Sequence, residues 1–200
     1  MKTNKILMAE SREALVGKWQ TAVLTALVYV VIMIAVSAIP KAGSLIKFII
    51  SGPFVLGLAI FWLNLSRKNN VKMEMMFSGF NDFGKALGLY ALMVLFIFLW
   101  FLLLIIPGIM AALSYSMAFF IMADNKEIGV REALKQSKKI MYGNKWKFFC
   151  LCLRFIGWAL LSILTLGIGF LWLIPYMSVA HAKFYDDIKN AKPEAATDPK

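Results

Sequence analysis

The side chains that could carry chemistry in this sequence are few, and they do not form a catalytic set. His181 is the only histidine, so a metal site built from several histidines is excluded, and we expect it to be an interfacial side chain. No P-loop, G-x-S-x-G or H-E-x-x-H motif occurs. Cys150 and Cys152 lie in one apolar run, and we expect both to face lipid or neighbouring helices as small apolar residues. The sequence predicts no catalytic residue, no cofactor and no metal site.

Arg154 is the residue most able to contact a ligand. On a helix it lies about 10 Å further into an apolar segment than Lys147, at a rise of ~1.5 Å per residue. No acidic residue in the apolar segments could pair with it. Snorkelling to the headgroups is the simpler interpretation. The alternative is that Arg154 faces the interior of the bundle and holds an anion, for example a lipid phosphate.

Two further polar features of the apolar segments bear on function. Ser114 and Ser116 flank Tyr115, and hydroxyl groups of this kind commonly join membrane helices, although they could also line a polar pocket. No aspartate or glutamate lies within an apolar segment, whereas proton- and sodium-coupled carriers commonly place carboxylates there. The sequence therefore disfavours a coupled transporter.

These residues are set in a chain with the composition of a membrane protein. Of its 200 residues 60% are hydrophobic, and the mean hydropathy is +0.72. This exceeds the usual apolar share of soluble domains, and the apolar runs are long enough to cross a hydrocarbon core of ~30 Å as helices. We predict an all-α polytopic membrane protein, a single transmembrane domain over residues 1–188, and a disordered tail over 189–200.

The charges indicate how the chain is threaded through the membrane. All but three of the 22 lysines and arginines lie in the N-terminal segment, the 66–85 and 124–147 loops and the C-terminal tail; the exceptions are Lys41, Lys47 and Arg154. Basic loops next to spans stay cytoplasmic. We therefore expect the chain to turn at Pro107-Gly108 and again within Thr165 to Gly169. The prediction is six spans in three hairpins with both termini cytoplasmic, at about 21–39, 45–65, 86–106, 108–123, 148–166 and 167–182.

An internal repeat accompanies these hairpins. A polar lead segment precedes each pair of spans and ends in glycine followed by lysine, at Gly17, Gly84 and Gly143. Glycine at such a place ends a helix in the left-handed conformation. The first and third leads share the sequence REAL, at 12–15 and 131–134. In 127–142 the apolar and charged residues fall on opposite helical faces, so we expect an amphipathic helix along the membrane surface or across the cytoplasmic ends of the bundle.

Several stretches resemble one family, including "LLLIIPGIMAALSYSMAFFIMADN", "REALKQSKKIMYGNKWKFF" and "FIGWALLSILTLGIGFLWLIPYMSVAHAKFYDDI". In order, and from Ser11 to Ile188, they are similar to the bacterial integral membrane proteins grouped as domain of unknown function 975. The resemblance implies a polytopic protein of the bacterial plasma membrane. It implies no reaction and no catalytic residues.

Three classes of function stay open at this point. The first is a non-enzymatic bundle that interacts through its basic inner surface with membrane lipids, anionic ones among them, or with other membrane proteins or itself. The second is a small permease or channel, in which Arg154 and the short second limbs would line a passage. A continuous polar cavity between Arg154, Tyr115 and Lys47 would favour it. The third is a lipid-modifying enzyme, which the lack of carboxylates and histidines in the spans disfavours. Nucleic-acid binding is not expected, because most of the basic residues lie in loops and tails beside the spans.

Overall fold

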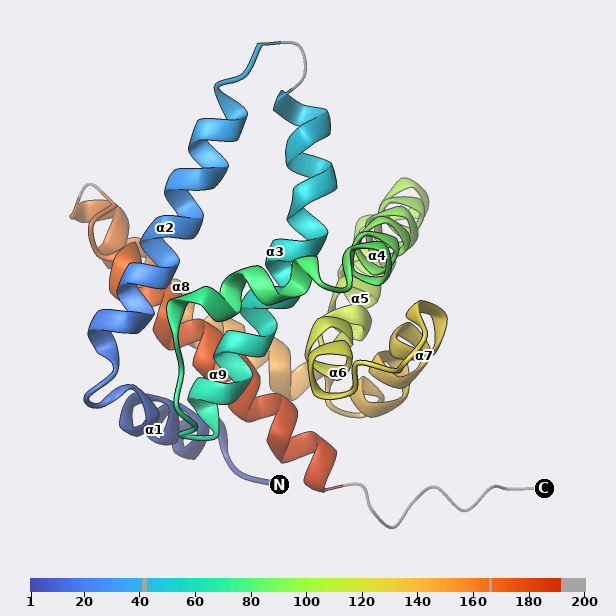
Figure 1. The fold of residues 1–200 in the computed structure, drawn as a ribbon. Helices are drawn as coiled ribbons and strands as arrows, with labels where there is room; N and C mark the ends of the chain where they lie inside the picture. The colour runs from blue at the N-terminus through green and yellow to red at the C-terminus, as the bar shows by residue number, and fades with distance from the viewer. Residues whose placement is uncertain (41–42, 166, 192–200) are drawn as a thin grey trace.

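A computed structural model describes residues 1–40, 43–165 and 167–191, and in these ranges the chain is helical with no strand. The elements shown in Figure 1 are α1 (Asn4–Leu15), α2 (Trp19–Ser37), α3 (Gly43–Ser66), η1 (Met73–Phe80), α4 (Phe83–Leu103), α5 (Ile105–Tyr115), α6 (Ala118–Asp124), α7 (Val130–Met141), α8 (Lys145–Leu164) and α9 (Phe170–Asn190). The all-α prediction is confirmed. Of the predicted tail, 192–200 lies outside the described residues, and α9 itself continues to Asn190.

Five helical segments are long and apolar enough to cross a membrane. They are Trp19–Ser37, Gly43–Ser66, Phe83–Leu103, Ile105–Asp124 and Lys145–Leu164. Helix α9 is of similar length, but its last two turns carry Lys183, Asp186 and Asp187. The sixth span over 167–182 is therefore not among the segments that the described structure supports, and it stays a prediction.

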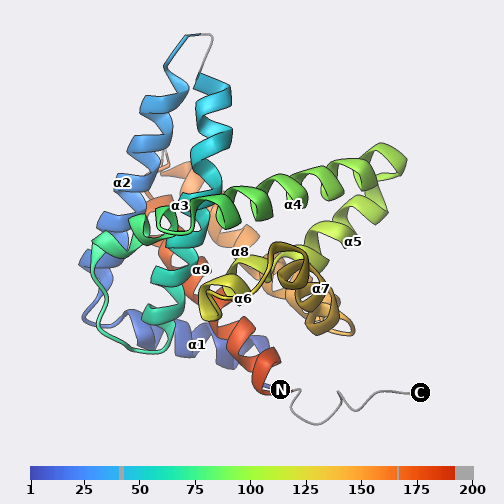
Figure 2. The ribbon, with the colours of Figure 1, turned by 45° about the vertical axis from the view of Figure 1, so that its right-hand side comes forward.

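The helices form three antiparallel pairs that diverge from one base. The pairs are α2 with α3, α4 with α5 and α6, and α8 with α9, and each points in its own direction (Figures 1 and 2). Their far ends, which we call the tips, expose large apolar side chains such as Leu102 (74%), Ile106 (73%) and Leu164 (80%). The buried core lies where α3, α6 and α9 meet, and it includes Phe61, Met117 and Phe184. The tips are therefore the parts suited to hydrocarbon.

The turn between α4 and α5 differs in detail from the prediction. Leu104, in an extended conformation, separates the two helices, so Pro107-Gly108 is not the turn. Pro107 lies in the first turn of α5, where its missing N–H leaves no helical hydrogen bond unmade. A Cβ on Gly108 would lie 2.6 Å from the ring of Phe101, so this glycine allows close packing of the pair. In the third pair, Gly167 has φ +87°, which confirms a glycine-dependent turn there.

The lead segments form α1, η1 and α7, which we call the lead helices, and each packs on the pair that precedes it in the cycle. Helix η1 packs on α2 and α3, and α7 packs on α4, α5 and α6. Helix α1 packs on α8 and α9 and so closes the ring (Figure 1). The contacts of each lead helix with the pair that follows it are less extensive. Sequence patterns predicted a lead segment before each pair. Only the structure shows that each lead helix packs mainly on the preceding pair rather than on the pair that follows it in the chain.

The repeat is closest at the ends of α1 and α7. Gly17 and Gly143 both have positive φ, +74° and +80°, as the predicted left-handed helix ends require. A single shift in residue number takes Gly17 to Gly143, Leu15 to Met141 and Ser11 to Ser137. Both residues of the Leu15–Met141 pair and both serines are fully buried. Under that shift the two REAL sequences do not coincide: one is the last turn of α1 and the other the first turn of α7. The shared REAL sequence therefore does not mark equivalent positions of the two lead helices.

Gly84 departs from the predicted pattern, because it lies inside α4 and is not among the glycines with positive φ. The middle lead instead forms the 3-10 helix η1. The first limbs nevertheless begin alike: the amides of Ala22, Ala86 and Phe148 each donate to the carbonyl four residues earlier, and all three side chains are buried. The threefold unit is therefore regular in its hairpins and irregular in its middle lead.

One arginine joins the inner ends of the three pairs at the charged base. Arg67, at the end of α3, contacts Asp124 at the end of α6 (2.6 Å) and Asp186 in α9 (2.7 Å). Asp124 also accepts hydrogen bonds from Tyr185 (3.1 Å) and Lys189. Its hydrogen bond to Asp124 raises the pKa of Arg67, and burial beside Asp124 raises the pKa of Tyr185. The base is thus a cross-link between helix ends far apart in sequence.

Candidate functional site

The surface that combines charge with an apolar cavity lies where α1 packs on α8 and α9, and we call it the first groove. Its outer part is a pocket of about 530 Å³. Lys5 and Arg12 reach it from α1, Arg154 and Trp158 from α8, and Tyr176 from α9. Arg154 and Trp158 lie one helical turn apart on the same face of α8. The groove therefore gathers side chains from both ends of the chain.

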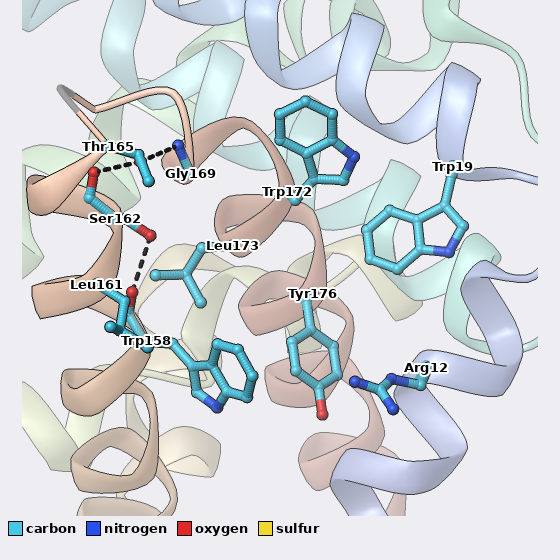
Figure 3. Close-up of a pocket in the computed structure, with 10 residues that line it drawn as sticks. All are labelled: Arg12, Trp19, Trp158, Leu161, Ser162, Thr165, Gly169, Trp172, Leu173 and Tyr176. Atoms are coloured by element: carbon cyan, nitrogen blue, oxygen red, sulfur yellow. Dashed lines mark hydrogen bonds between the residues drawn. The ribbon is translucent and has the colours of Figure 1, made fainter.

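A second pocket of about 290 Å³ continues the first groove toward the tip of the α8–α9 pair (Figure 3). Arg12, Trp158 and Tyr176 line both pockets, so the two are continuous. The inner pocket adds Trp19 and Trp172, which Figure 3 shows on the same side of the cavity. The remaining lining residues are Leu161, Ser162, Thr165, Gly169 and Leu173. Three of the six tryptophans of the chain thus surround one cavity.

Hydroxyl groups in the inner pocket are already bonded to the backbone. Ser162 donates to the carbonyl of Trp158 (2.8 Å) and Thr165 to that of Ser162 (2.9 Å). Thr165 Oγ1 also accepts the amide of Gly169 (3.0 Å), as Figure 3 shows. These bonds hold the turn between α8 and α9 and leave the cavity wall predominantly apolar. The inner pocket is therefore suited to hydrocarbon rather than to a polar solute.

Side-chain contacts fix α1 in place over the groove. Leu7, Ser11 and Leu15 form its fully buried face. The hydroxyl of Tyr176 donates to the carbonyl of Met8 (3.3 Å), and the amide of Asn4 donates to the carbonyl of Lys147 (3.0 Å). Arg12 and Lys5 are consequently held on the side of α1 that faces the opening.

The charge of the groove is not neutralised by the protein. Within the ranges that the structure describes, Lys5, Arg12 and Arg154 form no ion pair and no side-chain hydrogen bond. Glu13 stands at the rim, but its carboxylate is engaged by Lys68 (2.6 Å), and this hydrogen bond lowers the pKa of Glu13. Three cations thus border an apolar cavity without a protein counter-ion.

The structure places the residues singled out in the sequence as follows. Arg154 is exposed and lies in the wall of the first groove. Tyr115 lines a different pocket with Ser114, and Lys47 lines neither of the two. None of the pockets described here is lined by all three residues. Ser114 is buried and its carbonyl accepts the hydroxyl of Ser137 (2.7 Å), which agrees with a packing role.

His181, which was predicted to be an interfacial side chain, lies in α9 and its ring contacts residues of α8. Its ring lies 5.0 Å from that of Phe148, and its Nε2 is 3.8 Å from the Sγ of Cys152. Both cysteines are free and half-buried. No group of three or more metal-ligating residues occurs among the residues described. The pair is a packing contact rather than a built site.

Sequence reasoning did not find Arg12, Trp158 or Tyr176. Trp158 could have been found, because it stands one turn from Arg154 and an arginine beside a tryptophan is typical of a membrane interface. Arg12 and Tyr176 carried no such signal, since they meet Trp158 only after the first and last helices have packed together. An arrangement of fixed cations over an aromatic cavity can bind an amphipathic anion: the cations hold the anionic group and the rings contact its chains.

Comparisons with known proteins bear on the family alone. The family model described as "Protein of unknown function (DUF975)" matches residues 1–110 and 101–192. No curated protein and no solved structure matches the chain. The match extends over almost the whole sequence, as the resemblance from Ser11 to Ile188 predicted. This chain belongs to the DUF975 family of proteins of unknown function.

Proposed function

We propose that this protein is a non-enzymatic, multi-pass protein of the bacterial plasma membrane that binds anionic phospholipid in the first groove. The observation that carries the proposal is the set of unpaired cations, Lys5, Arg12 and Arg154, above a cavity lined by tryptophans. A phosphodiester next to Arg12 and Arg154 would be neutralised, and its acyl chains would follow Trp158 and Trp172 toward the tip. Aromatic and basic residues are enriched at this depth of a bilayer.

The proposed orientation has six spans, with the charged base in the cytoplasm. Each helical pair leaves the base and returns to it, so the basic segments lie together at one end, where translocation is resisted. Cysteine labelling in intact cells tests this. In a Cys150→Ala, Cys152→Ala background, the exposed Gln136→Cys is expected to resist an impermeant reagent until the cells are opened. Labelling in intact cells would refute the orientation; Ser137 is unsuitable because it is fully buried.

Binding is tested by titrating the delipidated full-length protein with phosphatidylglycerol and, separately, with phosphatidylcholine. Because three tryptophans line the inner pocket, their fluorescence reports occupancy. We expect phosphatidylglycerol alone to change the emission. Arg154→Leu should weaken binding about fivefold, since one basic side chain near a bilayer contributes ~1 kcal/mol, whereas Arg154→Lys should stay close to the parent.

Lys72→Leu is the matched control, because Lys72 is exposed and its replacement removes the same charge outside the groove. Equal binding by the parent, Arg154→Leu and Arg154→Lys would overturn the proposed site. Equal binding of phosphatidylcholine and phosphatidylglycerol would overturn the role of charge.

A further inference from the structure

A second groove lies where α7 packs on α4 and α5. It has an outer pocket of about 360 Å³ and an inner pocket of about 230 Å³. Tyr115 and Lys138 line both, so the two are continuous, as they are in the first groove. The outer pocket is lined by Leu92, Phe96, Tyr115, Arg131, Leu134, Lys135 and Lys138. We call this surface the second groove.

The second groove has side chains of the same kind as the first at several equivalent positions. The shift that takes Gly17 to Gly143 also takes Lys5 to Arg131 and Arg12 to Lys138. The shift between the first limbs, which takes Ala86 to Phe148, takes Phe96 to Trp158. The second limbs correspond as well. The shift that takes Gly108 to Gly169, where each glycine packs closely against its first limb, takes Tyr115 to Tyr176. The grooves are therefore two copies of one arrangement.

The two outer pockets are lined by the same number of basic residues although one has moved, and Lys145 adds a further cation to the inner pocket of the second groove. Arg154 of the first groove corresponds to Leu92 in the second, which removes a charge from the first limb. Ala9 of α1 corresponds to Lys135 of α7, which adds a charge to the lead helix. Each outer pocket is thus bordered by three basic residues. None of those in the second groove forms an ion pair within the described ranges, and no described residue lining it is acidic.

The third position of the repeat, where η1 packs on α2 and α3, is closed. The shift that takes Ala22 to Ala86 takes Arg12 to Met76, and the shift that takes Gly17 to Gly143 takes Ile50 to Tyr176. Met76 and Ile50 belong to one apolar cluster with Met33 and Phe54, and Met76 is fully buried. The residues equivalent to Trp158 and Arg154 are Ile32 and Val28, which pack against the same cluster. Among the described residues, the equivalents of the groove cations and aromatic side chains at this position are apolar and pack against one another.

We propose that the second groove is a second site for anionic phospholipid, so that one chain holds two such lipids and not three. This inference rests on the proposed function of the first groove and extends it to a site with its own residues. Charge complementarity selects the occupant: Arg131, Lys135 and Lys138 face a phosphate, and Phe96 and Trp100 line the adjoining apolar surface. The open apolar side of the groove selects a lipid rather than a free anion.

Native mass spectrometry of the delipidated full-length protein, titrated with phosphatidylglycerol, counts the sites. The parent is expected to saturate at two lipids. Lys138→Met, which imitates the closed third position, is expected to bind one, as is Arg12→Met, and the double variant none. Lys72→Met is expected to keep both, because Lys72 is exposed and in the middle lead. Lys138→Gln, which keeps a polar side chain, should weaken the second site about fivefold.

Each other outcome is informative. One lipid on the parent, lost in Arg12→Met and unaffected by Lys138→Met, would overturn the second site and leave the first standing. No saturable binding at all would overturn both. Three lipids would show that the position under η1 is open. Equal competition by inorganic phosphate would show that the groove takes a free anion and would overturn the lipid assignment.

Discussion

The α2–α3 pair and the α8–α9 pair carry their lead helices in opposite ways. Under η1 the backbones touch: Gly57 of α3 faces the carbonyl of Met76, and Gly79 of η1 faces the carbonyl of Pro53. Over α8 and α9, side chains of α1 line a pocket, the first groove. The same supersecondary plan thus gives packed core at one position and a binding surface at another. Gly57 and Gly79 allow the close approach of η1 to α3, and Met76 fills the space between them.

Gly57→Ala is expected to have the largest effect, because it breaks the closed position. A Cβ at residue 57 would lie 1.9 Å from the carbonyl oxygen of Met76, so α3 and η1 must separate, at a cost of about 3 kcal/mol. Thermal unfolding of the purified protein in detergent measures this. Gly157→Ala in α8 is the matched control: nothing lies within 4 Å, and we expect stabilisation of about 0.5–1 kcal/mol. Equal effects of the two variants would contradict the comparison.

Met76→Lys should destabilise the fold nearly as much. It places a positive charge at the closed position, where the two grooves have Arg12 and Lys138. Met76 is fully buried in an apolar cluster without an acidic partner, so a lysine there is expected to cost about 3–5 kcal/mol. Met76→Leu keeps the volume and should cost less than about 1.5 kcal/mol. The reciprocal change, Arg12→Met, should barely alter thermal unfolding, since Arg12 is exposed. A tolerated Met76→Lys would mean that the third position can open.

Arg67→Met tests the tie between the two compared pairs and should have the smallest of the three destabilising effects. The change removes the ion pairs of Arg67 with Asp124 and Asp186. Asp124 still pairs with Lys189, whereas Asp186 loses its pair with the arginine. Because the groups are partly exposed, we expect a loss of about 1–3 kcal/mol rather than that of a fully buried pair. Lys68→Met, which breaks an exposed pair with Glu13, should lower the melting temperature less than Arg67→Met does. Equal melting temperatures for both variants would contradict a stabilising role for the ion pairs of Arg67 at the charged base.

Local features of the fold followed from local sequence. The amphipathic pattern of 127–142 predicted α7, whose buried face includes Ala133, Leu134, Ser137 and Met141. Gly17 and Gly143 end their helices as glycine in the left-handed conformation does. The position of the α4–α5 turn was missed by a few residues, since proline is compatible with the first turn of a helix as well as with its end. In each case the deciding interactions lie within one or two helical turns.

The residues of the grooves were harder to predict. Arg154 was found because a cation in an apolar run is conspicuous, whereas Arg12 looked like any basic residue of a polar lead segment. The two REAL sequences lie at opposite ends of α1 and α7, and the alignment of these helices depends instead on Gly17, Gly143 and the serines at Ser11 and Ser137. A shared sequence of four residues is weaker evidence for aligning two helices than a glycine whose positive φ ends each of them.

By itself the sequence determined that this chain is helical, that its apolar runs could enter a membrane and that its charges gather at one end of each run. Run length, charge and glycine content act over a few residues, so they can be read locally. Only the tertiary structure decided that α1 packs on the last pair, that Arg12 meets Arg154 and Tyr176, and that Met76 fills what would otherwise be a third groove. Those contacts join residues far apart in the chain, and they depend on how closely whole helices approach one another.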